Sequence, residues 1–285
     1  NGRFRDTIRK FGKGDAGQVS DLGWRLTGSF DLYGDDGRSA YNSVNFITCH
    51  DGFTLCDLVT YNHKHNDANG ENNRDGSDDN NSWNCGFEGE TAETEIIRLR
   101  KQLVKNYLCM LIFSSGTPMI LGGDEFMRTQ KGNNNAYCQD SDISWFDWEL
   151  AEKNADILDF FGKTVEFTKR YTILQRRKFF LGKDLNADNI PDLSWFGTEG
   201  KEPAWLDQSL RTLGFRLDGG EETSENGCYH LFFILNAGHA AGYVSLPNNA
   251  PVKKWRRIID TSLPQGEDFL EHGKEILIDP PDHYI

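Results

Sequence analysis

A histidine and an aspartate stand side by side at the end of a short apolar segment. His50-Asp51-Gly52 follows a β-branched run over 44–48, which is typical of a buried strand, and the glycine starts the turn away from it. In a (β/α) barrel the loops after the strands build the active face, so this position predicts a catalytic imidazole and carboxylate. The pair also fits a strand end at which Asp51 caps the next turn.

Two loops rich in amides and aromatic rings accompany the pair. The first contains Trp83, and the second contains Asn133, Asn134 and Asn135. An amide offers paired donor and acceptor groups to hydroxyls, and an indole face stacks on the apolar side of a sugar ring. We therefore expect a sugar-binding groove. The alternatives are that Trp83 fills the core of its own loop and that the asparagines form a tight turn.

Composition limits the classes of partner. The chain has 285 residues, a formal net charge of −13 and 7 Trp, 9 Tyr and 19 Phe. Such an acidic chain lacks the basic patch that binds nucleic acid or an anionic membrane, and its apolar runs are far shorter than the ~20 residues of a membrane helix. The 6 cysteines form no CxxC pair, which is consistent with reduced thiols in a cytosol-like compartment. His63 and His65 have no evident third ligand, so no metal site is expected.

Apolar spacing predicts an α/β arrangement around His50-Asp51. A helix is expected over 93–115, between strands over 44–49 and 117–121, as one βαβ unit of a parallel sheet. Both strands end in acidic residues. Asp124 and Glu125, at the end of the second strand, are expected to be structural.

The rest of the chain divides into a helical and a strand-rich part. A helix is expected over 154–174, whereas a period of two predicts an antiparallel β-sandwich with strands over 211–217, 229–236 and 252–259. We place the first domain over residues 1–180 and the second over residues 181–285.

Residues 15–42 are expected to be loop-rich, and basic side chains gather on the helix before them and on the expected helix over 93–115. A solvated or ion-paired helix face, rather than a binding patch, is expected for Arg3, Arg5, Arg9 and Lys10. The face of the 93–115 helix opposite its apolar side is expected to carry Arg98, Arg100, Lys101 and Lys105.

Several of these motifs, in this order, resemble the α-amylase superfamily, glycoside hydrolase family 13. Residues 46–53 resemble its fourth signature region, and residues 116–125 resemble its eighth barrel strand. Residues 1–6, 82–86 and 132–140 are similar to the isoamylase and glycogen-debranching branch of that superfamily. The resemblance is specific as far as about residue 180 and looser beyond it.

The resemblance implies the C-terminal portion of a (β/α)8 TIM barrel followed by an antiparallel β-sandwich domain. It also implies a retaining glycosidase that removes α-1,6 branches from glycogen, amylopectin or limit dextrin. Asp51 would be the third catalytic carboxylate, which hydrogen-bonds the sugar in subsite −1 and stabilises its flattened transition state. The implied substrate-binding residues are His50, Asn133, Asn134, Asn135 and Trp83. No cofactor is required, and the implied location is the cytoplasm, or the plastid in a plant or alga.

The nucleophile and the general acid of that family have no counterpart in the sequence. The family carries them on its fourth and fifth barrel strands, and no such motif precedes Asp51. Residues 214–218 imitate the nucleophile motif, but they follow the eighth strand. We interpret Asp218 as a sandwich loop residue before a turn over 219–222. The chain is therefore expected to be a fragment that needs the missing N-terminal part of the same enzyme and is inactive alone.

Three other interpretations stay open. The chain could be a non-catalytic glucan-binding or regulatory subunit of a debranching complex, against which the intact His50-Asp51 pair argues. It could have another activity of the superfamily, such as that of a trehalohydrolase or a transglycosylase, although the loop over 83–86 favours debranching. It could also be a carbohydrate-binding sandwich attached to the remnant of a barrel.

Overall fold

The computed structural model describes residues 1–220, 228–248 and 254–285. The chain divides into two units. Unit 1 comprises Asn1–Lys13, Val44–Ile112 and Thr117–Val165, and unit 2 comprises Gly14–Ser43, Phe113–Gly116 and Glu166–Ile285. Unit 2 thus includes residues 14–43, which the sequence predicts to belong to the first domain. The predicted domain boundary near residue 180 itself stays a prediction.

Unit 1 is mostly helix and loop. Its helices are α1 (Gly2–Gly12), α4 (Leu55–Leu58), α5 (Thr94–Ile112), α6 (Glu149–Lys153) and the first part of α7 (Ala155–Arg170). Its strands are β1 (Val44–Asn45) and β2 (Thr117–Pro118), and single 3₁₀ turns lie at Asp67–Asn69, Asp124–Phe126 and Ala136–Cys138.

The predicted parallel pairing of the strands on either side of the long helix is confirmed. Val44 pairs with Thr117 and Asn45 with Pro118 in a parallel ladder, and α5 lies between the two strands in sequence. Each strand is only 2 residues long, shorter than predicted. In the described chain β1 and β2 pair only with each other, so they form a sheet of two strands.

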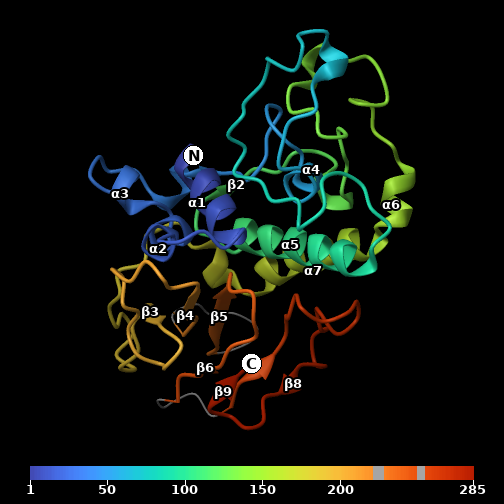
Figure 1. Ribbon diagram of the computed structural model, residues 1–285. Coiled ribbons are helices and arrows are strands. Elements are labelled where there is room, and N and C mark those ends of the chain that lie inside the picture. The colour runs from blue at the N-terminus through green and yellow to red at the C-terminus, as the bar shows by residue number, and fades with distance from the viewer. Residues whose placement is uncertain (221–227, 249–253) are drawn as a thin grey trace. The chain divides into compact units, whose positions relative to one another are not determined.

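Three helices of unit 1 are joined through polar contacts as well as apolar ones. The buried Phe4 and Ile8 of α1 follow helical spacing, and the Tyr107 hydroxyl of α5 donates to the backbone oxygen of Arg9 at 3.3 Å. On the α7 side, Lys101 of α5 forms an ion pair with Asp156 at 2.8 Å. Figure 1 shows α5 and α7 running alongside each other. Contacts of α5 with α1 and with α7 therefore join these three helices of unit 1.

Unit 2 carries the antiparallel strands that the period of two predicts. They are β3 (Leu193–Phe196), β4 (Thr212–Asp218), β5 (His230–Asn236), β6 (Val244–Ser245), β7 (Arg256–Arg257), β8 (Ile276–Leu277) and β9 (His283–Tyr284). They form a sheet in the order β3-β4-β5 (Figure 1) and the two-stranded pairs β6-β9 and β7-β8. The rings of Phe215 and Phe233 stack at 4.6 Å in the core of the three-stranded sheet. Residues 252 and 253 of the predicted strand 252–259 lie outside the described residues.

Within unit 2, the loop-rich residues 15–42 also form α2 (Val19–Leu26) and α3 (Phe30–Tyr33), with a 3₁₀ turn at Ala40–Asn42. Val19, Leu22 and Leu26 are buried along one face of α2, which stabilises this short helix despite its glycine-rich surroundings.

Asp218 is the last residue of β4 rather than a loop residue, and it is buried beside His230 of β5. Residues 221 and 222 of the predicted turn lie outside the described chain. Among the described residues, no helix is long and apolar enough to cross a membrane.

Candidate active-site rim

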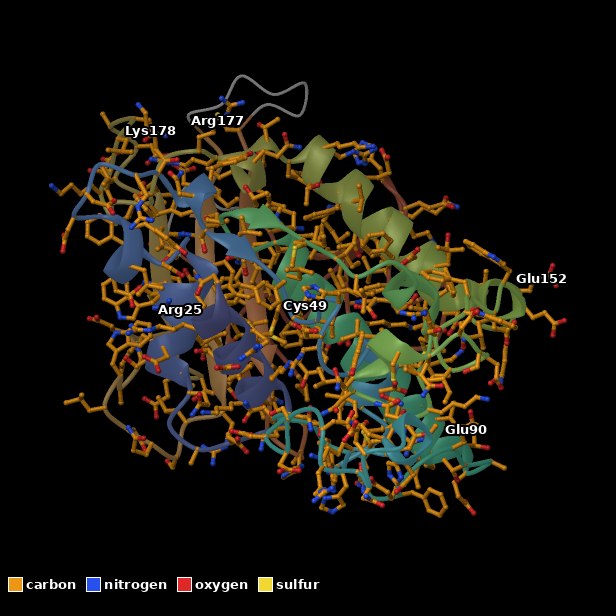
Figure 2. The ribbon with its side chains drawn as sticks, turned by 90° about the horizontal axis from the view of Figure 1, so that it is seen from above. Arg25, Cys49, Glu90, Glu152, Arg177 and Lys178 are labelled. Carbon is orange, nitrogen blue, oxygen red and sulfur yellow. The ribbon has the colours of Figure 1, made fainter. Side chains whose placement is uncertain are left out.

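His50 and Asp51 lie in the loop that follows β1, with both side chains exposed. Their side chains are 87% and 80% accessible, and His50 Nε2 lies 3.3 Å from Asp51 Oδ2. Cys49, labelled in Figure 2, directly precedes the pair and marks its position on the ribbon. Gly52 turns the backbone with a φ of +90°, a conformation that disfavours any residue with a Cβ. The pair is therefore presented to solvent by a turn that requires glycine.

A buried carboxylate holds both ends of this loop. The hydroxyl of Thr48 donates to Asp124 Oδ2, and the backbone N–H of Leu55 donates to Asp124 Oδ1 at 2.9 Å. Asp124 thus joins the end of the β1 segment to the start of α4, with Asp51 between the two points. The structural role predicted for Asp124 is confirmed by these contacts. Burial raises the pKa of Asp124 to about 7.

This shift predicts that the chain loses stability as the pH rises through 7. An unfolded aspartate has a pKa near 3.9, so between about pH 4 and 7 the folded state holds a proton that the unfolded state has released. The stabilisation from the protonated Asp124 is therefore complete below pH 4 and is lost as the pH rises through about 7. We expect Asp124→Asn to flatten the decline in melting temperature between pH 5 and pH 8.

Asparagine suits this test because its amide keeps an oxygen for the Leu55 N–H, and the Thr48 hydroxyl can accept as well as donate. Asp57, whose pKa burial raises to about 6, contributes a decline in the same direction that persists in the variant. The exposed Asp21 of α2 gives the matched control, Asp21→Asn. An unchanged slope in Asp124→Asn would contradict the assignment.

Asn134 connects the Asp51 loop to the first amide-rich loop. Its backbone oxygen accepts from the Gly52 N–H at 3.0 Å. Two hydrogen bonds of 2.9 Å join Asn134 to Asn66, one from the backbone N–H of Asn134 to Asn66 Oδ1 and one from Asn66 Nδ2 to Asn134 Oδ1. Asn134 Nδ2 also donates to the oxygens of Ser77 and Asn80. This buried side chain therefore fixes the loop that lies against Gly52.

Asn133 and Asn135 extend the same network. Asn133 Nδ2 donates to Asn69 Oδ1 at 2.8 Å, and Asn133 Oδ1 accepts from the backbone N–H of Asn135 at 2.9 Å. Asn135 Nδ2 and Asn69 Nδ2 both donate to Asp75 Oδ2, at 2.9 and 2.7 Å. Asn133 is buried, whereas Asn135 is half-buried. The three asparagines are thus brought together beside Asp51, and their contact with a sugar stays a prediction.

A second buried carboxylate, which the sequence analysis did not single out, supports this loop from α4. Asp57 accepts a hydrogen bond from the Thr129 hydroxyl at 2.5 Å and another from the Gln130 N–H at 2.8 Å. The sequence offers one signal for Asp57: it lies six residues after Asp51, in the first turn of the helix that follows.

Trp83 lies in a loop that is fixed by an acidic side chain. Trp83 is half-buried, and its backbone N–H donates to the oxygen of Leu58 at 3.0 Å. Close by, Glu88 accepts from the backbone N–H groups of Asn62 and His63 and from the Asn84 amide, at 2.8, 3.0 and 2.9 Å. Burial alone would raise the pKa of Glu88, but these hydrogen bonds lower it to about 2. Stacking of Trp83 on a sugar stays a prediction.

The expectation of a solvated or ion-paired face is wrong for Arg9, and two of the basic residues of α5, Arg100 and Lys105, are buried as well. Arg9 is buried, and its guanidinium donates to the backbone oxygens of Ile47 and Asn80. Burial lowers its pKa to about 10.

Arg100 is also buried and donates to the backbone oxygens of Asn84, Phe87 and Gly89. Lys105 is buried as well, with its ammonium 5.3 Å from the centre of the Phe160 ring. Arg9 and Arg100 satisfy loop carbonyls from helices, so long-range contacts rather than local pattern decide their burial.

Within residues 1–220, 228–248 and 254–285, no group of three His, Cys, Asp or Glu side chains is arranged to hold a metal ion. The loop after β1 offers an exposed carboxylate and an exposed imidazole, and the network of buried amides holds the neighbouring loop against it. The carboxylate and the imidazole can exchange hydrogen bonds with the hydroxyls of a neutral polar ligand.

Comparison with known sequences identifies relatives along almost the whole chain. Residues 194–279 match the family described as Isoamylase 1-3, C-terminal. A glycogen operon protein GlgX homolog of Mycobacterium tuberculosis (strain ATCC 25618 / H37Rv) is 42% identical over 281 residues, covering 94% of this chain and 38% of that protein. Isoamylase 3, chloroplastic, of Oryza sativa subsp. japonica is 40% identical over 274 residues, covering 96% of this chain and 33% of that protein. The chain therefore spans little more than a third of the length of these relatives.

Solved structures support the fold. A pullulanase type I from Bacillus subtilis str. 168, complexed with maltose, superimposes with a TM-score of 0.68 at 18% identity, over 100% of this chain and 33% of that one. The apo pullulanase of Paenibacillus barengoltzii gives a TM-score of 0.60 at 21% identity, over 98% of this chain and 36% of that one. An α/β part followed by a β-rich C-terminal part is thus common to all three.

Proposed function

The chain belongs to the isoamylase-type debranching family, and from that premise we propose that it forms the C-terminal part of a glycosidase that cleaves α-1,6 branch linkages of glycogen or starch-like glucans. The observation that carries the proposal is the exposed Asp51, held beside Asn134 by the Gly52 hydrogen bond. Capping of the following helix does not account for Asp51, because Thr54 is the N-cap of α4 and its side chain accepts from the Asp57 N–H.

In this proposal β1 and β2 are neighbouring strands of a (β/α)8 barrel that ends near residue 180. Their parallel pairing and the α5 connection are what such a barrel requires. Asp51 and the buried Asp124 then belong to the rim at the carboxyl ends of these strands. The antiparallel strands of residues 181–285 form the accompanying β-sandwich.

The proposed reaction proceeds with retention and needs two further carboxylates, a nucleophile and an acid/base, which the sequence of this chain does not supply. The part of the enzyme with the earlier barrel strands would provide them. Asp51 would accept hydrogen bonds from the hydroxyls of the sugar in subsite −1, and His50 would donate to the same ring. These contacts tighten as the ring flattens, so they lower the barrier more than they strengthen ground-state binding.

The substrate-binding roles divide according to burial. The buried Asn133 and Asn134 would shape the rim through their backbone, whereas the half-buried Asn135 and Trp83 have accessible surface for a glucan. The substrates we propose are branched, neutral α-glucans, which suit a chain of net charge −13.

The proposal predicts that the 285-residue chain alone releases no reducing sugar from glycogen limit dextrin. A longer polypeptide that adds the earlier barrel strands is expected to release short chains from the limit dextrin and none from linear maltoheptaose. Reducing-end assays on both proteins make the comparison. Turnover by the 285-residue chain, or equal turnover of the linear glucan by the longer protein, would refute the proposal.

A further inference from the structure

The guanidinium of Arg9 joins two segments of unit 1 that are far apart in the sequence. Arg9 is buried, with 5% of its surface accessible. Its Nε and Nη2 donate to the backbone oxygen of Ile47 at 2.9 and 2.6 Å, and its Nη1 donates to the backbone oxygen of Asn80 at 2.9 Å. We call these contacts the Arg9 bridge. Burying a cation is costly, and in the described chain the hydrogen-bond partners of this one are carbonyl oxygens, so the bridge binds backbone rather than a counter-ion.

The stretch of chain that carries Asp51 is held at both ends. At one end, the backbone oxygen of Ile47 accepts two hydrogen bonds from Arg9. At the other end, the Gly52 N–H donates to the backbone oxygen of Asn134 at 3.0 Å. Asp51 lies between these two points, directly before Gly52. Its backbone position therefore depends on both contacts.

The Arg9 bridge also joins the two ends of this stretch to each other. Asn134 Nδ2 donates to Asn80 Oδ1 at 2.9 Å, and the backbone oxygen of Asn80 accepts from Arg9. A continuous path of contacts thus leads from Gly52 back to Ile47 and closes the stretch into a ring. Loss of the guanidinium would open this ring.

Asp124 holds the same stretch but does not connect it to the buried amide network. Its carboxylate accepts from the Thr48 hydroxyl and the Leu55 N–H, which lie on either side of Asp51 in the chain. Arg9 instead reaches the loop whose amides contact the neighbouring asparagines. Asp124 therefore fixes the shape of the stretch, whereas the Arg9 bridge fixes its position against the amides.

The bridge starts from a helix that is itself anchored. α1 buries Phe4 and Ile8, and the Tyr107 hydroxyl of α5 donates to the backbone oxygen of Arg9 at 3.3 Å. A guanidinium is planar and aims its donors in fixed directions, whereas a lysine ammonium is a point charge on a flexible stem. Burial lowers the pKa of Arg9 to about 10, so the bridge keeps its charge at neutral pH. Arginine thus suits a contact that must hold two carbonyl oxygens at a fixed separation.

We propose that Arg9 is a positioning residue, which fixes Asp51 relative to the amide-rich loops by joining Ile47 to Asn80. This inference rests on the proposed function, because it gives Arg9 a part in the reaction at Asp51. Arg9 contacts no substrate in this role and acts through the backbone. A displacement of about 1 Å at a reacting group can lower a rate about 10²-fold, so a buried residue of α1 can control turnover at the rim.

Hydrogen exchange at the Gly52 amide of the 285-residue chain tests the bridge. Arg9→Lys keeps the charge, but its single ammonium cannot hold both carbonyl oxygens in the same geometry, so we expect exchange about tenfold faster than in the parent. Arg9→Met donates to neither oxygen, and we expect exchange about 100-fold faster. A residue that supported only global stability would instead accelerate exchange at the buried amides of α5, such as that of Leu108.

Steady-state kinetics of the longer polypeptide on limit dextrin test the part in catalysis. Arg9→Lys is expected to lower kcat about tenfold and to leave KM within about twofold, because a displaced Asp51 loses contacts made mainly in the transition state. Since Arg9 acts through Asp51, the double variant Arg9→Lys/Asp51→Asn should be no slower than Asp51→Asn alone. Losses that multiply in the double variant would contradict the positioning role.

Two other arginines give matched controls. Arg5 lies one turn earlier on α1 and forms a surface ion pair with the residue that follows it, so Arg5→Lys should leave Gly52 exchange and kcat unchanged. Arg100 of α5 also binds loop carbonyls, but those within residues 84–89, so Arg100→Lys should keep Gly52 exchange within about twofold of the parent. Equal acceleration in Arg100→Lys, or a Gly52 amide that responds to neither Arg9 variant, would overturn the proposal. A parent chain in which the Gly52 amide exchanges without protection would overturn it too.

The outcome is distinguishable from that of the proposed function. If the longer polypeptide cleaves limit dextrin but Arg9→Lys keeps the parent kcat, only the positioning role fails. If the longer polypeptide cleaves nothing while Gly52 exchange still depends on Arg9, the proposed hydrolysis fails and the Arg9 bridge stands as the support of the Asp51 loop.

Discussion

Replacing Asp51 by asparagine in the longer polypeptide is expected to lower kcat about 10²- to 10³-fold. The substitution keeps the size of the side chain but removes the negative charge that, in the proposed function, faces the developing oxocarbenium ion. KM is expected to stay within about threefold, because the lost interaction acts mainly in the transition state. The side chain is 80% exposed, so the fold should not respond to the change. Steady-state kinetics on limit dextrin measure both constants.

The exposed Asp67, in the same unit, provides the matched control for this charge removal. Asp67→Asn is expected to leave kcat unchanged within experimental scatter. His50→Ala should fall between the two, since it removes one hydrogen-bond donor but no charge. If Asp51→Asn retained more than about a tenth of the turnover, Asp51 would be a binding or capping residue and the catalytic assignment would be wrong.

The sequence predicts best the long helices, in which apolar residues recur along one face over several turns. The expected helix over 93–115 is α5 (Thr94–Ile112), and the expected helix over 154–174 is α7 (Ala155–Arg170). The length of the strand over 44–49 is harder to predict, because a strand extends only as far as a partner strand shares its backbone hydrogen bonds. Val44 and Asn45 find that partner in β2, while the residues that follow them are held by side chains such as Asp124.

At the candidate site, exposed motif residues were easier to find than the buried residues that hold them. His50 and Asp51 stand out because a polar pair ends an apolar run. Asp57, Arg9 and Arg100 bind groups far away in the sequence, and nothing in a local window reports such partners. Burial of charged side chains is therefore the property that sequence reading missed here.

Replacing Asn134 by alanine is expected to release the loop that lies against Gly52. The change removes the acceptor of one Asn66 Nδ2 hydrogen bond and the donor to Asn80 Oδ1 and Ser77 O in a buried place, which costs about 3 kcal/mol in local stability. Because the Gly52 N–H donates to Asn134 O, hydrogen exchange at that amide reports the release directly. An increase of about 100-fold in its exchange rate corresponds to this cost.

Asn134→Asp separates hydrogen bonding from the loss of volume in the same measurement. Aspartate has nearly the shape of asparagine, but its carboxylate cannot donate to the oxygens of Ser77 and Asn80, which accept from Asn134 Nδ2. We therefore expect Asn134→Asp to expose the Gly52 amide at least as much as Asn134→Ala does. Asn42, an exposed asparagine of unit 2, supplies the control, and Asn42→Ala should leave Gly52 exchange unchanged. Full protection of Gly52 in Asn134→Asp would show that packing, and not the amide network, fixes the position of Asp51.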